Sequence, residues 1–458
     1  MNTAITKETI LKYDQPGPRY TSYPTAPVWN DRVTSQIYIE KLKQFGATNK
    51  TLSLYIHIPF CETMCTYCAC NVIIRRHDEH YADEYIRYLE KEIDLVVKYI
   101  GQRKTIRQFH LGGGTPNFLT DNQLKRLMAK IHAEFDLDAQ AEIAIEIDPR
   151  VISPSHIQTL KEAGFNRVSM GIQDFNADVQ KEVNRIQPFE LVEAVTQSCR
   201  AVGIDSINFD LIYGLPKQTV QSFNDTIAKV IRLKPNRIAL YSFAYVPWLK
   251  KHQTKIDVKD LPASEQKMDI FLSARAKFLE HGYSAIAMDH FALEDDELAR
   301  AFNNEELYRN FMGYTVKPAD EYIGLGVTAI GFLENSYIQN HKILSTYYEI
   351  LNQNRLPVER GIVLSLDDQI RRWVINSLMC QFKIDKQQIS QKFHVDFDKY
   401  FSIEQSHVQQ CIDEELLFIE GKLIRVSEMG KLFIRNICMG FDQYLKQPQT
   451  PKRFSQTI

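Results

Sequence analysis

Four cysteines stand within ten residues of the chain, in the order Cys61, Cys65, Cys68 and Cys70. Their spacing, Cys-x3-Cys-x2-Cys-x-Cys, allows the thiolates to meet at one inorganic centre, and iron–sulfur clusters are normally held by cysteine thiolates. Zinc and redox-active thiols are the alternatives. A structural zinc site usually pairs two Cys-x2-Cys knuckles, and the sequence has no second knuckle. The spacing therefore favours an iron–sulfur cluster.

These cysteines come directly after a predicted strand. In residues 52–58, LSLYIHI, apolar residues alternate with more polar ones, which is typical of a strand. Pro59 ends this strand, so the cysteines lie on the loop that leaves its carboxyl end. The other four cysteines stand singly among apolar neighbours, and we interpret them as buried thiols.

Five more strands are predicted, and helices separate them. The strands are expected at residues 104–114, 141–147, 166–172, 205–214 and 236–243. The helices are expected at about 78–100, from Thr120, from Ser153 to Gly164, across 176–202 and at 219–233. This alternation predicts parallel βαβ units, in which ligands gather at the carboxyl ends of the strands. The periodicity fits both an open sheet and a barrel.

Glycines and polar residues stand at those strand ends. Gly112-Gly113-Gly114-Thr115-Pro116 follows the second strand and allows a ligand to approach the backbone closely. Glu146, Gln173 and Asp210 end or nearly end the next three strands, and Arg185 could bind a carboxylate with two hydrogen bonds. A tight turn, a capping acid and a solvated arginine are ordinary alternatives. Together the residues indicate a polar, glycine-lined mouth.

The cysteine motif after a first strand resembles that of the radical S-adenosylmethionine (SAM) enzymes. The stretch LYIHIPFCETMCTYCACN is similar to the oxygen-independent coproporphyrinogen III oxidases in particular. The resemblance implies that Cys61, Cys65 and Cys68 hold a 4Fe–4S cluster whose fourth iron chelates SAM. It also implies that Cys70 is the family's extra, catalytic cysteine. The expected fold is a partial six-stranded (β/α) barrel of radical SAM type.

The same resemblance assigns the strand-end residues to two SAM molecules. For the cluster-bound SAM it implies Tyr55, Gly113, Glu146 and Ile330. For a second SAM beside it, the residues implied are Tyr67, Gly114, Thr115, Gln173, Arg185, Asp210 and Ala244. The division between two sites comes only from the resemblance.

An aromatic, proline-rich segment precedes the first strand. Residues 12–29, KYDQPGPRYTSYPTAPVW, contain four prolines that keep the chain extended, a charged Arg19 and the aromatic residues Tyr13, Tyr20, Tyr23 and Trp29. RYTSYPTA, at 19–26, is similar to the arm of the same oxidases. The segment is either a flap over the site or an arm packed on the body for stability.

The sequence pattern changes at about residue 364. An amphipathic helix is expected from Leu366, with Ile370, Val374, Leu378 and Met379 on its apolar face; a hairpin follows at 418–427 and a helix at 428–445. We predict three parts: an extended arm (1–35), a catalytic domain (36–363) and a mostly helical, winged-helix-like cover (364–458). Residues 365–458 hold 13 Lys/Arg and 12 Asp/Glu, so no nucleic-acid partner is expected.

Composition sets the remaining expectations. The formal charge is −2, hydrophobic residues make up 44% of the chain, and no segment has the apolar length of a signal or membrane span. We expect a cytoplasmic, monomeric protein with no membrane partner. The resemblance implies anaerobic oxidative decarboxylation of two propionates of coproporphyrinogen III, giving protoporphyrinogen IX, with a low-potential electron donor such as a flavodoxin.

Two other classes remain as alternatives. A related heme chaperone shares the cysteine triad and barrel but traps heme. Such chaperones generally have an aromatic residue at the position of Cys70 and lack the RYTSYPTA arm. A zinc-stabilised winged-helix regulator would need a basic recognition face, which the composition does not show.

Overall fold

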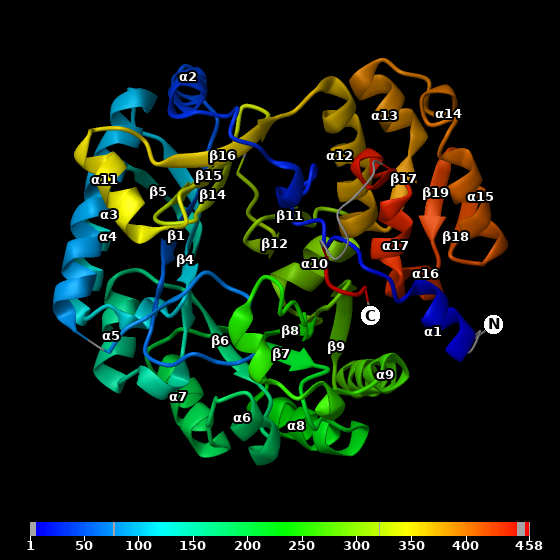
Figure 1. Ribbon diagram of the computed structural model, residues 1–458, viewed down its shortest axis with the longest axis horizontal. Coiled ribbons are helices and arrows are strands. Elements are labelled where there is room, and N and C mark those ends of the chain that lie inside the picture. The colour runs from blue at the N-terminus through cyan, green and yellow to red at the C-terminus, as the bar shows by residue number, and fades with distance from the viewer. Residues whose placement is uncertain (1–5, 77, 320, 447–453, 458) are drawn as a thin grey trace.

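The computed structural model describes residues 6–76, 78–319, 321–446 and 454–457. Six parallel strands lie side by side in chain order, as the sequence predicts. They are β1 (Leu52–Ile58), β4 (Thr105–Gly113), β5 (Asp136–Ile147), β6 (Arg167–Gln173), β7 (Ser206–Tyr213) and β8 (Arg237–Ser242). Figure 1 shows that these strands follow an arc, so the βα repeats form part of a barrel wall.

The sheet has more strands than the six that were predicted. Its order is β16-β15-β14-β13-β1-β4-β5-β6-β7-β8-β10-β9, which makes twelve strands among the described residues, with β16 and β9 at the open ends. The additional strands are β9 (Tyr283–Ala287), β10 (His290–Leu293), β13 (Glu321–Leu325), β14 (Ile330–Leu333), β15 (Ser336–Asn340) and β16 (Val358–Val363). They are short, and β13 and β15 are buried on both faces, so their sequences lack the alternation that marks a strand.

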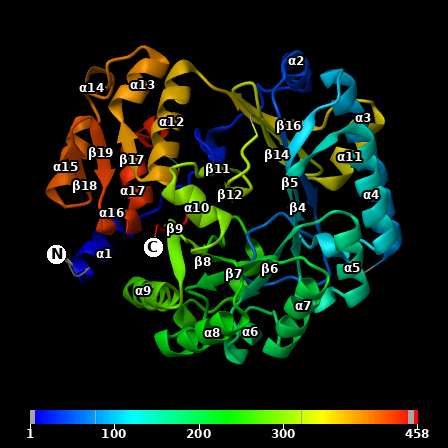
Figure 2. The ribbon, with the colours of Figure 1, turned by 180° about the vertical axis from the view of Figure 1, so that it is seen from behind.

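Helices cover the convex side of the arc (Figures 1 and 2). They are α3 (Glu79–Ile100), α4 (Asp121–Glu134), α5 (Pro154–Glu162), α6 (Ala177–Glu182), α7 (Phe189–Ala201), α8 (Val220–Leu233) and α9 (Ser264–Glu280). Local signals explain where they begin: Thr120 and Gln123 form the expected capping box of α4, and the Ser153 side chain caps α5. Because the six strands are parallel, their carboxyl ends lie along one edge of the sheet.

A mostly helical unit follows β16. It contains α12 (Leu366–Gln381), α13 (Lys386–Phe393), α14 (Phe397–Tyr400), α15 (Gln405–Asp413), and a small sheet of β17 (Lys383–Asp385), β19 (Leu423–Val426) and β18 (Leu417–Glu420). The predicted hairpin is present. The single helix predicted at 428–445 is instead divided into α16 (Glu428–Leu432), α17 (Ile434–Met439) and η6 (Gln443–Lys446). Phe433 leaves helical geometry and separates the first two. Leu366 is exposed rather than on the apolar face.

The aromatic residues of the N-terminal arm are buried. Tyr13, Tyr20, Tyr23 and Trp29 are at most 9% exposed. The arm also contains a helix that was not predicted, α1 (Lys7–Tyr13). The arm is bound to the C-terminal unit: the Tyr20 hydroxyl donates to Asp442 Oδ2 (3.1 Å), and Arg435 Nε donates to the carbonyl of Pro18 (3.0 Å). These contacts favour the packed arm over a free flap.

This packing leads to a stability prediction. Tyr23 is 1% exposed, and its ring lies 6.0 Å from that of Tyr444. Tyr23→Ala is expected to lower the free energy of unfolding by about 3–5 kcal/mol, because it empties a buried aromatic site. Leu11→Ala, at a side chain 57% exposed, should change it little. Urea unfolding of both variants tests this, and equal midpoints would show that the arm contributes nothing to stability.

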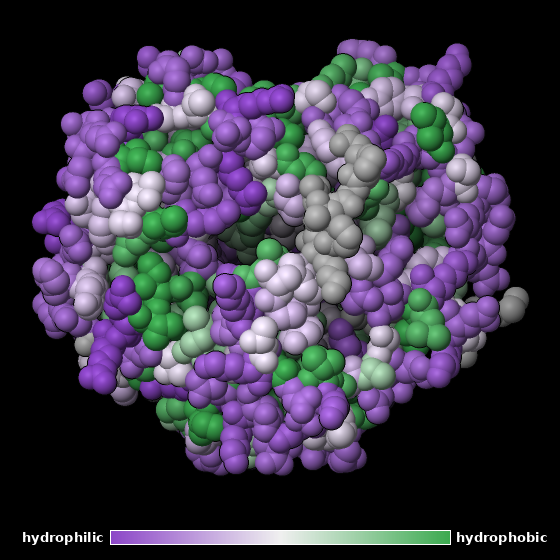
Figure 3. Space-filling model, viewed as in Figure 1, coloured by the Kyte–Doolittle hydropathy of each residue, from purple (hydrophilic) through white to green (hydrophobic). Residues whose placement is uncertain are grey.

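The surface is mainly polar, and a hollow opens near the centre of the face in Figure 3. No helix among the described residues is long and apolar enough to cross a membrane.

Candidate active site

The cysteine loop starts at the carboxyl end of β1 and is closed at its base by a short parallel pairing. β2 (Phe60–Cys61) pairs with β3 (Ile73–Ile74), and the amide of Ile73 donates to the Pro59 carbonyl (2.7 Å). At its far side the amide of Thr66 donates to the carbonyl of Val183 (3.0 Å). The loop is therefore held at both ends over the mouth of the barrel.

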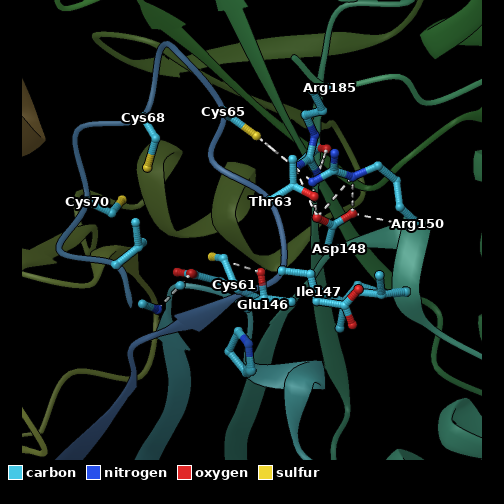
Figure 4. Close-up of a pocket in the computed structure, with 18 of the residues that line it drawn as sticks. Cys61, Thr63, Cys65, Cys68, Cys70, Glu146, Ile147, Asp148, Arg150 and Arg185 are labelled. Carbon is cyan, nitrogen blue, oxygen red and sulfur yellow. Dashed lines mark hydrogen bonds and ion pairs between the residues drawn. The ribbon is translucent and has the colours of Figure 1, made fainter. Parts of the chain in front are cut away.

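The loop's thiols surround a cavity of about 300 Å³. Cys61, Cys65, Cys68 and Cys70 all line it, and Figure 4 shows them arranged around its interior. All four are free thiols. Among the described residues no three His, Cys, Asp or Glu side chains converge on a single-ion site. The spread of the thiols around an open space suits a cluster of several metal atoms, which sets its cysteine ligands apart.

Two cations lie beside Cys65. Its sulfur is 3.8 Å from Arg185 Nη1 and 3.9 Å from Arg150 Nη2. Both guanidinium groups also pair with Asp148, whose Oδ2 lies 3.1 Å from Arg185 and 2.6 Å from Arg150 (Figure 4). Burial opposes the charge of Asp148, but the two arginines outweigh it and lower the pKa of that carboxyl. The Cys65 sulfur therefore lies against two guanidinium groups that a buried carboxylate holds in place.

The other three thiols of the loop differ in their pKa values. Burial raises the pKa of Cys61 to about 11, although the Thr115 hydroxyl lies 3.2 Å from its sulfur. A hydrogen bond from the Cys70 thiol lowers the pKa of Cys68 to about 7, and the same hydrogen bond raises the pKa of Cys70. Thiolates are the form that binds metal, so cluster assembly must release protons here.

Glu146 closes the inner side of the cavity. Its carboxylate accepts hydrogen bonds from His110 Nε2 (3.0 Å) and from the amide of Gly113 (3.2 Å). Burial opposes ionisation, but the hydrogen bond and charge of His110 outweigh it and lower the pKa of Glu146. A Cβ at Gly113 would lie 2.7 Å from the His57 ring, so only glycine allows this close approach, and its φ of +119° also requires glycine. The result is a fixed anion above a glycine turn.

Two acceptors, Gln173 and Asp210, also line this cavity. The buried side-chain oxygen of Gln173 has no hydrogen-bond partner among the described residues, and Gln173 itself has a φ of +65°. Asp210 accepts from Ser169 Oγ (3.0 Å) and Asn208 Nδ2 (2.9 Å). Burial and the nearby Glu146 raise the pKa of Asp210 to about 6. An unpaired polar atom on a residue with an unusual backbone conformation, as at Gln173, is typical of a site built for a polar ligand.

A second cavity, of about 560 Å³, adjoins the first. Cys70, Gly113 and Glu146 line both cavities. The Tyr55 hydroxyl lies 3.0 Å from His57 Nδ1, and its ring stacks on that of His110 (centroids 5.9 Å apart). The two cavities therefore share one wall that carries a thiol, a carboxylate and a glycine turn.

The structure groups the residues that the sequence singled out. Tyr55, Gly113, Glu146 and Ile330, predicted for the cluster-bound SAM, all line the larger cavity. Six of the seven residues predicted for a second SAM line the smaller cavity: Tyr67, Gly114, Thr115, Gln173, Arg185 and Asp210. Ala244 is not among the described residues that line either cavity, and its carbonyl accepts from Gln253 Nε2 (3.1 Å). The ligand assignments stay predictions.

Sequence reasoning missed two sets of residues. Asp148 and Arg150 stand two and four residues after Glu146 in the IEIDPR stretch, and this position at the strand end was a signal that could have found them. The second set has no sequence signal, because it lies about 180 residues from the cysteines that it holds. Lys250 Nζ donates to the Cys70 carbonyl (2.8 Å), His252 Nε2 to that of Cys68 (2.7 Å) and Gln253 Nε2 to that of Tyr67 (2.9 Å).

A buried carboxylate supports the wall that carries Ile330. Glu92, on α3, is fully buried; its Oε2 accepts from the Gly326 amide (2.8 Å) and the Tyr347 hydroxyl (2.6 Å), and its Oε1 from Asn340 Nδ2 (2.6 Å). Burial raises the pKa of Glu92 to about 7, with these hydrogen bonds acting in the opposite direction. Glu92 therefore holds the turn before Ile330, and its contribution to the free energy of unfolding depends on pH.

Glu92→Gln is expected to change the pH dependence of stability. The folded-state pKa of about 7 exceeds the ordinary 4.5, so the stability that Glu92 contributes is complete below pH 4.5 and is lost as pH rises to about 7. The loss totals as much as roughly 3 kcal/mol. The glutamine variant has no ionisable group at this position. The difference between its urea midpoint and that of wild type should therefore be larger, in favour of the variant, at pH 8 than at pH 5.5. Glu349→Gln, at an exposed position, is the control. A difference that is constant with pH would contradict the assignment.

A thiol triad after the first strand of an open β/α barrel, beside a glycine turn at the sheet's carboxyl edge, defines the radical SAM class of proteins. The model of the Radical SAM superfamily matches residues 55–230, and that of the HemN C-terminal domain matches residues 364–433. The chain is 43% identical to the oxygen-independent coproporphyrinogen III oxidase of Synechocystis sp., over 98% of this chain and 97% of that one. The chain belongs to the oxygen-independent coproporphyrinogen III oxidase family.

Other relatives agree with this assignment. The oxidase of the same name from Escherichia coli is 42% identical over 98% of this chain and 97% of its own length. The solved structure described as "Coproporphyrinogen III oxidase (HemN) from Escherichia coli is a Radical SAM enzyme" superposes with a TM-score of 0.89 at 41% identity, covering 93% of this chain and 97% of that chain. The predicted fold class is confirmed, with the larger strand count described above.

Proposed function

We propose that this protein catalyses the anaerobic oxidative decarboxylation of two propionate side chains of coproporphyrinogen III, which become the vinyl groups of protoporphyrinogen IX. The observation that carries the proposal is the pair of adjoining cavities, with three cysteines around one and Cys70 between them, in a chain similar over nearly its full length to oxidases of that name. The larger cavity provides space for a substrate beside the radical source.

The residues present fit a 4Fe–4S cluster and SAM. Cys61, Cys65 and Cys68 supply three thiolates, and the glycine turn and the unpaired Gln173 oxygen supply close backbone and polar contact for a small ligand. We propose that one SAM lies along the shared wall, at Gly113 and Glu146, and a second in the smaller cavity, at Gln173 and Arg185, which leaves the rest of the larger cavity to the substrate. When bound, the cluster and SAM together supply a 5′-deoxyadenosyl radical, with methionine as the other product.

The protein's own groups prepare that chemistry. Glu146 is held ionised by His110 and Gly113, so it can accept hydrogen bonds from an ammonium group or from ribose hydroxyls. Arg185 lies beside Cys65 and is available to a carboxylate at the first cavity. The walls of the cavities exclude water from a reactive radical. Cys70, where the cavities meet, is assigned to the substrate step.

For each propionate the balance is simple. A hydrogen atom leaves the β-carbon, the carboxylate departs as CO2, and one electron passes to an acceptor, which leaves a carbon–carbon double bond. A low-potential donor such as a flavodoxin supplies the electron that starts each cycle. The free cysteines suit a reducing compartment, which supports a cytoplasmic location. We further propose a monomer divided into arm (1–35), catalytic domain (36–363) and C-terminal cover (364–458).

An anaerobic product assay tests the proposal. Reduced holoenzyme supplied with SAM and coproporphyrinogen III should release CO2 and form protoporphyrinogen IX through a monovinyl intermediate, and air should abolish this activity. SAM cleavage without a vinyl product would reject the substrate. Tight binding of heme with coproporphyrinogen left unchanged would favour a heme chaperone instead.

A further inference from the structure

The larger cavity has an amphipathic lining. Tyr241, Phe311 and Met312 give it apolar and aromatic surface apart from the residues predicted for SAM, and Lys250 and Lys342 bring two ammonium groups to it. A ligand with an apolar ring body and several carboxylates matches this combination, because the ring packs on the apolar surface while the ammonium groups bind the carboxylates.

The charged residues that line this cavity favour an anionic ligand. Among the described lining residues Glu146 is the one carboxylate, and it already accepts from His110 and Gly113. Lys250 donates one hydrogen bond, to the neutral carbonyl of Cys70. Lys342 lies 3.5 Å from Glu359, a residue outside the lining, and 45% of its side chain is exposed. An ammonium group has three donors, so both lysines retain capacity for a ligand carboxylate.

We propose that Lys250 and Lys342 bind two different carboxylates of the tetrapyrrole substrate; this inference rests on the proposed function. Lys250 is bound to the Cys70 backbone, so a carboxylate that it holds lies beside Cys70, where the two cavities meet. This position presents the reacting propionate to the radical source. Lys342 holds a second carboxylate at the more exposed rim and sets the orientation of the ring.

Equilibrium binding tests the proposal. The probe is coproporphyrin III, the fluorescent oxidised macrocycle, titrated anaerobically into reconstituted holoenzyme, with its tetramethyl ester as the uncharged comparison. Lys250→Gln and Lys342→Gln should each weaken binding of the acid by about tenfold and leave binding of the ester unchanged. Lys251→Gln, at the exposed neighbouring lysine, should change neither.

Turnover separates this inference from the proposed function. Wild-type enzyme that makes no vinyl product would reject the function itself. Wild-type turnover with an unchanged KM for coproporphyrinogen and unchanged acid binding in both lysine variants would overturn the inference alone, as would an equal loss of acid and ester binding. Iron content is measured for each variant; if Lys250→Gln loses iron because the cysteine loop is disturbed, Lys342→Gln, on a separate segment, decides the outcome.

Discussion

Serine in place of Cys61, Cys65 or Cys68 is expected to give folded protein that lacks the iron–sulfur cluster. Each change removes one of three thiolate anchors, and a serine hydroxyl is a far poorer iron ligand. Iron and sulfide content and the visible absorption of anaerobically reconstituted protein measure the loss. SAM cleavage should fall to background in all three variants, because the electron that starts it comes through the cluster.

Cys70→Ser is the matched comparison, since it changes the same atom in the same loop. Cys70 lines both cavities and is expected to act on substrate rather than on iron. The variant should keep its cluster and its SAM cleavage but form no vinyl product. Loss of iron on this change would make Cys70 a ligand and would overturn the division between the triad and the fourth cysteine.

Glu146→Gln is expected to weaken SAM binding by roughly 10- to 100-fold, which is the effect of removing one charged hydrogen-bond acceptor. His110 and the amide of Gly113 hold this carboxylate at the shared wall of the cavities, so the change removes charge with little change in shape. The iron content should stay at the wild-type level. Equilibrium dialysis with labelled SAM measures the affinity.

Glu162→Gln is the control for Glu146→Gln, because Glu162 lies at the end of α5 with half of its side chain exposed. It should bind SAM as wild type does. If Glu146→Gln also retained wild-type affinity, the carboxylate would have no part in holding the cofactor. The glycine turn would then contact SAM through its backbone alone.

The βα repeats were predictable because each strand and helix is specified locally. The alternation in residues 52–58 and the capping box at Thr120 both depend on residues close together in sequence. β13 and β15 gave no such signal, since both of their faces are buried and their pairing depends on distant segments. The number of strands therefore exceeded the prediction while the repeat itself was correct.

The site was predictable where its residues stand at strand ends, as Glu146 and Gln173 do. The residues that stabilise the site could not be predicted in the same way. Lys250 and Gln253 contact the cysteine loop across about 180 residues, which no local pattern records. The arm shows the same limit: its aromatic composition was evident, but only the contact of Tyr20 with Asp442 shows that the arm packs against the C-terminal unit.

In the proposed reaction the protein's radical source removes hydrogen from a propionate β-carbon of the substrate. The most direct measurement uses coproporphyrinogen III that carries deuterium at those carbons, turned over anaerobically with unlabelled SAM. Mass spectrometry should then find deuterium in the 5′-deoxyadenosine that is released together with the vinyl product. Vinyl product accompanied by 5′-deoxyadenosine without deuterium would contradict the account.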